Sequence, residues 1–166
     1  FDALGGTMAT YVGQNVGAGK LKRIRQGVKS ATLMGSVYAL AAFAVLFFFG
    51  DQIPLLFVNA AETTVIEQAH LFLICVSSFY IPLVFVNVWR FSIQGMGFSA
   101  FAILAGVCEM IGRALVGFFL VPVLGFPAVC FASPVAWILA DLFLVPAFWH
   151  CMKTLKKMLP GETAGN

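Results

Sequence analysis

Charged residues are scarce in this sequence. Only 10% of its 166 residues are Asp, Glu, Lys or Arg, whereas 61% are hydrophobic. A soluble globular domain carries about 25% charged residues, so the composition excludes that class. Long apolar runs cross a bilayer as helices, because a helix satisfies its own backbone groups. We therefore expect an all-α integral membrane protein, a polytopic bundle of helices.

The sequence also lacks the motifs of metal, nucleotide and disulfide chemistry. Its four cysteines lie in or at the ends of apolar runs and form no CxxC pair. We interpret them as small buried hydrophobic residues rather than metal ligands. These are Cys75, Cys108, Cys130 and Cys151. No motif for ATP, haem, zinc or phosphate is present, so we expect no cofactor and no metal site.

Positive charge is concentrated in two short segments. Residues 20–29 contain five Lys or Arg and no acid, and residues 153–157 contain three Lys, together eight of the ten in the chain. Short basic segments beside membrane spans stay in the cytoplasm. We expect the C-terminus there, and the acidic segment 51–67 outside. The membrane context disfavours the alternative of a nucleic-acid-binding patch.

Five apolar stretches fit helices that enter or cross the membrane. The first resembles the end of a helix whose earlier part is missing, so we interpret residues 1–152 as a transmembrane fragment of a larger protein. Residues 153–166 would form a basic cytoplasmic tail. The predicted stretches are 1–15, 28–49, 69–89, 98–121 and 126–149.

Three sequence features predict how these spans pack and bend. Ser77, Ser78 and Pro82 predict a bend in the third span, because proline removes a backbone donor. Small residues recur every four positions in the second and the last span and predict faces for close helix packing. They are Ala31, Gly35 and Ala39, and Ala128, Ala132, Ala136 and Ala140.

Glu109 and Arg113 lie near the middle of the fourth span. Their i,i+4 spacing places a carboxylate and a guanidinium on one helical face, where each offsets the cost of removing the other from water. Two interpretations remain open. They form a structural ion pair between helices, or they line a substrate or ion path.

Two further ionisable residues have open roles. Asp141 lies about two turns before the inner end of the last span, where it either stays protonated or pairs with Arg113; we favour the pair and a structural role. His70 is expected near the outer end of the third span, as a wet interfacial side chain or a proton-linked gate.

Three stretches together resemble one known family. They are GQNVGAGKLKRIRQG at 13–27, LFVNAAETTVIEQAHLFL at 56–73 and the turn QGMGFS at 94–99. In this order and spacing they resemble multidrug and toxic compound extrusion (MATE) transporters. The resemblance implies twelve helices in two lobes, with this chain supplying the end of helix 8 and helices 9 to 12 of the C-terminal lobe. The missing N-terminal lobe would be its partner.

The resemblance also implies a function. Such transporters are not enzymes; they export small amphipathic or cationic substrates by antiport against H⁺ or Na⁺, here from a bacterial plasma membrane whose lipid surrounds the bundle. In one branch a carboxylate midway along helix 10 helps to bind sodium. The corresponding span here has no acid and offers a candidate polar lining of Ser77, Ser78, Tyr80 and Asn87.

Two other functions remain as alternatives. A flippase for lipid-linked precursors would use the same fold but needs a strongly cationic cavity, and only Arg113 is expected deep enough to contribute. An intramembrane enzyme would use Glu109, Asp141 or His70 as acid and base. Their spacing matches no catalytic signature, and no nucleophile is paired with a histidine.

Overall fold

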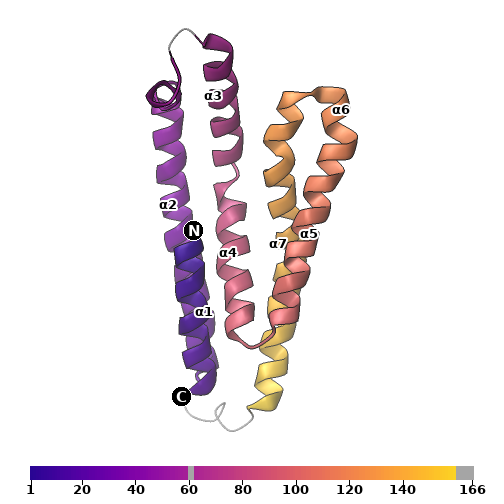
Figure 1. Cartoon of the computed structure of the whole chain (residues 1–166). Helices are drawn as coiled ribbons and strands as arrows, with labels where there is room; N and C mark the ends of the chain where they lie inside the picture. The colour runs from indigo at the N-terminus through magenta and orange to yellow at the C-terminus, as the bar shows by residue number, and fades with distance from the viewer. Residues whose placement is uncertain (60–61, 160–166) are drawn as a thin grey trace.

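A computed structural model describes residues 1–59 and 62–159, and all its regular elements within these ranges are helical. In chain order the elements are α1 (Asp2–Gly17), α2 (Leu21–Phe49), the 3₁₀ turn η1 (Pro54–Leu56), α3 (Thr63–Ser77), α4 (Tyr80–Gly95), α5 (Ser99–Leu115), the π-helical segment η2 (Val116–Leu120), α6 (Val121–Leu124) and α7 (Phe126–Met158). Successive spans run antiparallel in one bundle, whereas α1, α4 and α7 run in the same direction (Figure 1).

The connections fall at two opposite ends of the bundle. The α1–α2 and α4–α5 connections and the end of α7 lie at the lower end in Figure 1, whereas the α2–α3 connection and the α6–α7 turn lie at the upper end. The basic residues that begin α2 and end α7 therefore share the lower end, and Asp51 lies at the upper end. The charged segments are separated along the bundle axis as the sequence predicted.

Three helical stretches are long and apolar enough to span a membrane: Leu21–Phe49, Ser99–Leu124 and Phe126–Met158. The pair α3 and α4 makes a fourth if its two bent halves are counted as one span. Helix α1, with 16 residues, extends about 24 Å at 1.5 Å per residue. The expected all-helical membrane bundle is confirmed.

The third predicted span is bent, as expected. Helices α3 and α4 meet at an angle of 51°. At this break the hydroxyls of Ser77 and Ser78 donate to the carbonyl oxygen of Ile74, at 3.3 Å and 2.6 Å. Pro82 falls in the first turn of α4, where the missing donor is tolerated. Serine side chains and an early proline thus stabilise a broken helix.

Three helices extend beyond the spans that were predicted from hydrophobicity. Helix α2 begins at Leu21, so much of the basic segment is its first two turns. The span predicted to end at residue 121 continues through η2 to Leu124, because Pro122 occupies the first turn of α6; the chain turns only at Gly125, with φ +66°. Helix α7 reaches Met158 and carries the three Lys of the predicted tail. Residues 160–166 of that tail lie outside the described residues.

Small residues bring the helices together around α4, which packs against α1, α2, α5 and α7. Ala31, Gly35 and Ala39 are buried, and a Cβ atom on Gly35 would lie 2.6 Å from Val84 Cγ1. A Cβ atom on Gly95 would overlap the backbone of Ala9. The predicted packing face on α2 is confirmed, because these approaches exclude larger side chains.

Helices α5 and α7 form a tight antiparallel pair. A Cβ atom on Gly112 would lie 2.8 Å from Ala136 Cα. Nearer the lower end, the rings of Phe101 and Phe143 have centroids 6.3 Å apart. In α7, Ala128, Ala136 and Ala140 are buried and Ala132 is half-buried. This register places Glu109 of α5 and Asp141 of α7 at similar depths in the bundle.

Candidate intramembrane charge network

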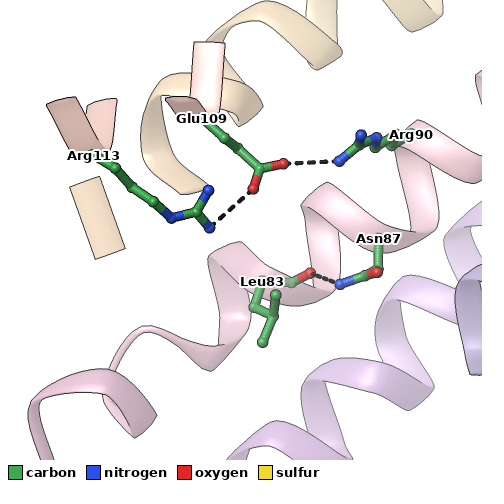
Figure 2. A network of polar contacts seen from close by, with 5 residues as sticks. All are labelled: Leu83, Asn87, Arg90, Glu109 and Arg113. Carbon is green, nitrogen blue, oxygen red and sulfur yellow. Dashed lines mark hydrogen bonds and ion pairs between the residues drawn. The ribbon is translucent and has the colours of Figure 1, made fainter. Parts of the chain in front are cut away.

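Glu109 lies between two arginines (Figure 2). Its Oε1 accepts a hydrogen bond from Arg90 Nη1 at 2.9 Å, and its Oε2 accepts one from Arg113 Nη2 at 3.2 Å. The Glu109 side chain is 12% exposed, whereas Arg90 and Arg113 are 34% and 47% exposed. We call these three residues the charge cluster. Its formal charge is +1, so one buried carboxylate offsets two less buried cations.

The fold brings these side chains together across the α4–α5 hairpin. Arg90 lies in the second half of α4, and Glu109 and Arg113 lie one turn apart on α5. Gly106 leaves room for the guanidinium, because a Cβ atom there would lie 3.0 Å from Arg90 Nη2. Removing one partner from a buried ion pair is costly, since the remaining charge is left without its counter-charge. The charge cluster therefore stabilises the packing of α4 against α5.

Sequence reasoning found the Glu109–Arg113 pair but missed Arg90. Arg90 was not among the predicted site residues, yet its side chain binds Glu109. The neighbouring Trp89 donates a hydrogen bond from Nε1 to the Thr32 hydroxyl at 3.3 Å. The sequence signal that could have identified this contact is the short turn at residues 94–99. In the structure Gly97 of this turn adopts φ +91°. An antiparallel hairpin there brings the end of α4 near the middle of α5.

Asp141 is the second carboxyl group at this depth, and its environment differs. Its Oδ1 is buried and has no hydrogen-bond partner among the described residues. Among the described residues, Arg113 forms its ion pair with Glu109. The predicted Arg113–Asp141 pair is therefore wrong. The i,i+4 geometry on α5 pairs the guanidinium with a carboxylate of its own helix.

The four residues predicted as polar lining have separate environments. Ser77 and Ser78 bind the carbonyl of their own helix at the bend. Asn87 is buried, and its Nδ2 donates to the carbonyl oxygen of Leu83 at 3.0 Å (Figure 2). Tyr80 contacts the Phe1 ring, with centroids 5.5 Å apart, and lines an open apolar groove of about 540 Å³.

His70 lies midway along α3, beside the end of α2 in the upper part of the bundle. Its Nδ1 is 2.6 Å from Asp51 Oδ1, an ion-pair distance without hydrogen-bond alignment. The Asp51 side chain is 82% exposed. The contact joins the end of α2 to α3 close to Gly50, whose Cβ position would lie 3.2 Å from the same nitrogen. This environment matches the interfacial interpretation more closely than a gate in the path.

Two of the predicted cysteine environments are observed directly. Cys130 and Cys151 are buried, whereas Cys75 and Cys108 are half-buried. Within residues 1–59 and 62–159, no three His, Cys, Asp or Glu residues come close enough to hold a metal ion. The notable chemistry of the described bundle is thus the charge cluster beside an unpartnered carboxyl group.

These features define the class of protein: an α-helical membrane protein with several spans and charged side chains held among them. The MatE family profile matches residues 3–140 of the 166, and the chain belongs to the MatE family. It is a MATE-type membrane transporter of small molecules, as the sequence motifs predicted. MATE-type transporters are not enzymes, which removes the alternative of an intramembrane enzyme.

No curated protein and no solved structure matches the chain significantly.

Proposed function

We propose that this chain supplies the C-terminal lobe of a secondary-active exporter for small amphipathic or cationic compounds. It would contribute the end of helix 8 and helices 9 to 12, and export would occur by alternating access against an N-terminal lobe of the same protein. Family membership supports the transporter class. The carboxyl groups of Glu109 and Asp141, held at similar depths among the spans, support a role for ion chemistry in this lobe.

The two carboxyl groups would serve different purposes. Glu109 has both oxygens bonded to arginines, so it has little capacity left for another cation. Asp141 has a buried oxygen without a partner in the described residues. An unpartnered carboxyl oxygen in a bilayer is a ready acceptor for H⁺ or Na⁺. We assign ion coupling in this lobe to Asp141 and a structural role to the charge cluster.

The observation that carries this assignment is the difference in partners between the two acids. A flippase for lipid-linked precursors would require free cations in its cavity. Arg90 and Arg113 both share Glu109, which offsets part of their charge. The exporter therefore fits the described side chains better than the flippase.

Transport by the full-length protein in proteoliposomes would test the proposal. A fluorescent organic cation should move against its gradient when either a Na⁺ or a pH gradient is imposed, and the effective gradient identifies the ion. Movement with neither gradient would contradict antiport.

The proposed orientation places the lower end of Figure 1 in the cytoplasm of a bacterial cell, because residues 20–29 and 153–157 there are basic. Cysteine labelling in intact cells would check it. A cysteine at Glu62 should react from outside, whereas one at Lys157 should react only after the cells are opened. The reverse pattern would contradict the orientation.

A further inference from the structure

We propose that the Arg113 side of α5 faces water rather than lipid in the assembled transporter, and that its guanidinium binds anionic groups of amphipathic solutes there. The choice of solute rests on the proposed export of such compounds, whereas the exposure to water does not. Arg113 lies in the stretch Ser99–Leu124, about 21 Å from its start and about 16 Å from its end at 1.5 Å per residue. The guanidinium is therefore attached deep within the membrane span.

The side chain of Arg113 is exposed although it lies within a span. Among the described helices, α5 packs against α4 and α7, whereas α3, which meets α4 at 51°, packs against α2 and α7. This arrangement leaves 47% of the Arg113 side chain uncovered by the described chain. A charged group in contact with lipid hydrocarbon is costly, so ionisable residues in spans face protein or a water-filled cavity. We assign the uncovered side of Arg113 to water.

The charge cluster keeps a positive charge that an anion can use. Figure 2 shows Arg90 and Arg113 approaching Glu109 from opposite sides, so one carboxylate is shared by two guanidinium groups. In the described part of the chain, Arg113 uses Nη2 for its hydrogen bond to Glu109. A guanidinium has five N–H donors, so further donors of Arg113 stay available. Carboxylate and phosphate groups accept such donors in pairs.

The exposed positions of α5 differ in chemistry between its two sides. Met110 lies three positions before Arg113 and Gly117 four positions after it, so both share its side of the helix. Ile111 and Leu115 are also exposed, but each lies two positions from Arg113, about 200° around the helix. The apolar side is suited to lipid, whereas the side with the guanidinium is suited to water.

The test measures how fast a cysteine on each side of α5 reacts with water-soluble reagents. Met110→Cys reports the Arg113 side, and its neighbour Ile111→Cys reports the opposite side at the same depth. Both positions are exposed in the described chain, at 63% and 45%, and both variants keep the charge cluster. Each is made in the full-length protein with its native cysteines replaced by alanine. The protein is reconstituted in liposomes and treated with thiosulfonate reagents that carry a sulfonate or a trimethylammonium group.

We expect both reagents to modify Met110→Cys at least about tenfold faster than Ile111→Cys, because a thiol reacts as its thiolate, which forms in water and is disfavoured in lipid. Equal rates at the two positions would overturn the exposure to water. Labelling needs no ion gradient, so its result is independent of whether the protein exports its substrate by antiport.

A second comparison tests the attraction of anions. In the Met110→Cys protein, Arg113→Gln removes the positive charge and Arg113→Lys keeps it. The rate with the sulfonate reagent, relative to the trimethylammonium reagent, should fall at least about twofold in Arg113→Gln and persist in Arg113→Lys, because a nearby cation attracts anions and repels cations even in water. An unchanged ratio in Arg113→Gln would overturn the attraction.

Protection from labelling tests the kind of solute. Dansylglycine, an amphipathic carboxylate, should slow the modification of Met110→Cys more than its methyl ester does, since only the carboxylate can pair with Arg113. This preference should disappear in Arg113→Gln. Equal protection by the acid and the ester in the presence of Arg113 would overturn the binding of anionic groups.

A second pair of positions covers the case in which Met110→Cys does not fold. Gly117 can accept a side chain, because nothing lies within 4 Å of its Cβ position, and the next residue, Phe118, is exposed. Gly117→Cys should react faster than Phe118→Cys with both reagents. Equal rates at these two positions would contradict a water-facing side of α5.

Discussion

Glu109 and Asp141 are acids at similar depths on two helices that pack directly together, yet they have opposite surroundings. Glu109 is held by Arg90 and Arg113 at 2.9 Å and 3.2 Å. Asp141 has a buried oxygen with no partner in the described residues. Placing a charged side chain inside the membrane costs free energy, so such residues are normally either paired or functional. Hydrogen-bond partners, more than depth in the membrane, therefore distinguish a structural acid from a candidate ion-binding acid.

The largest effect should come from breaking the paired acid. Glu109→Gln leaves Arg90 and Arg113 without their shared counter-charge, and we expect it to lower the free energy of unfolding by about 3–5 kcal/mol. Thermal unfolding in detergent measures this. A double variant with Arg113→Gln should recover only part of the loss, because Arg90 stays unpaired. Full additivity of the two single effects would show that Glu109 and Arg113 are not coupled.

The next effect concerns the contact that holds the two acids at similar depths. Gly112→Ala places a Cβ atom 2.8 Å from Ala136 Cα, so α5 must move away from α7. We expect a loss of about 1–3 kcal/mol in the same unfolding assay. Gly117→Ala is the control, because nothing lies within 4 Å of that position. Equal stability of the two variants would contradict the close approach of α5 and α7.

A smaller difference should separate the two arginines. Arg90 lies 2.9 Å from Glu109 and is 34% exposed, whereas Arg113 lies 3.2 Å away and is 47% exposed. Exposed ion pairs contribute little, so Arg90→Gln should cost more than Arg113→Gln, by on the order of 1 kcal/mol. Unfolding temperatures of the two single variants compare them directly. A larger loss in Arg113→Gln would reverse the assigned order of the two contacts.

The smallest effect on stability should come from the unpaired acid. Asp141→Asn keeps the size of the side chain and breaks no hydrogen bond to Oδ1 that the described structure contains. We expect a change of about 1 kcal/mol or less in the free energy of unfolding. A loss as large as that of Glu109→Gln would mean that Asp141 is structural, and the contrast between the acids would disappear.

The helices of the fold could largely be predicted from sequence. Apolar length identifies the long spans, and Ser77, Ser78 and Pro82 predict the bend that the structure places between α3 and α4. Helix ends were less predictable. The fourth span was predicted to end at residue 121, but Pro122 occupies the first turn of α6, where a proline is compatible with a helix.

The candidate site was predictable only within one helix. Glu109 and Arg113 have i,i+4 spacing, so their contact follows from helix geometry. The contact of Arg90 with Glu109 spans the α4–α5 turn and depends on how two helices align. The environment of Asp141 depends on the packing of α5 against α7 and on an arginine already engaged by Glu109. No local pattern carries that information.

We propose that Asp141 takes part in ion coupling whereas the Arg90–Glu109–Arg113 cluster stabilises the fold. The most direct test of this division of roles is export driven by the effective ion gradient in proteoliposomes containing Asp141→Asn, compared with wild type at equal amounts of folded, substrate-binding protein. If Asp141 couples export to the ion, the variant binds the fluorescent cation normally but no longer accumulates it against its gradient. Export at the wild-type rate would contradict the claim and leave Asp141 without a role in coupling.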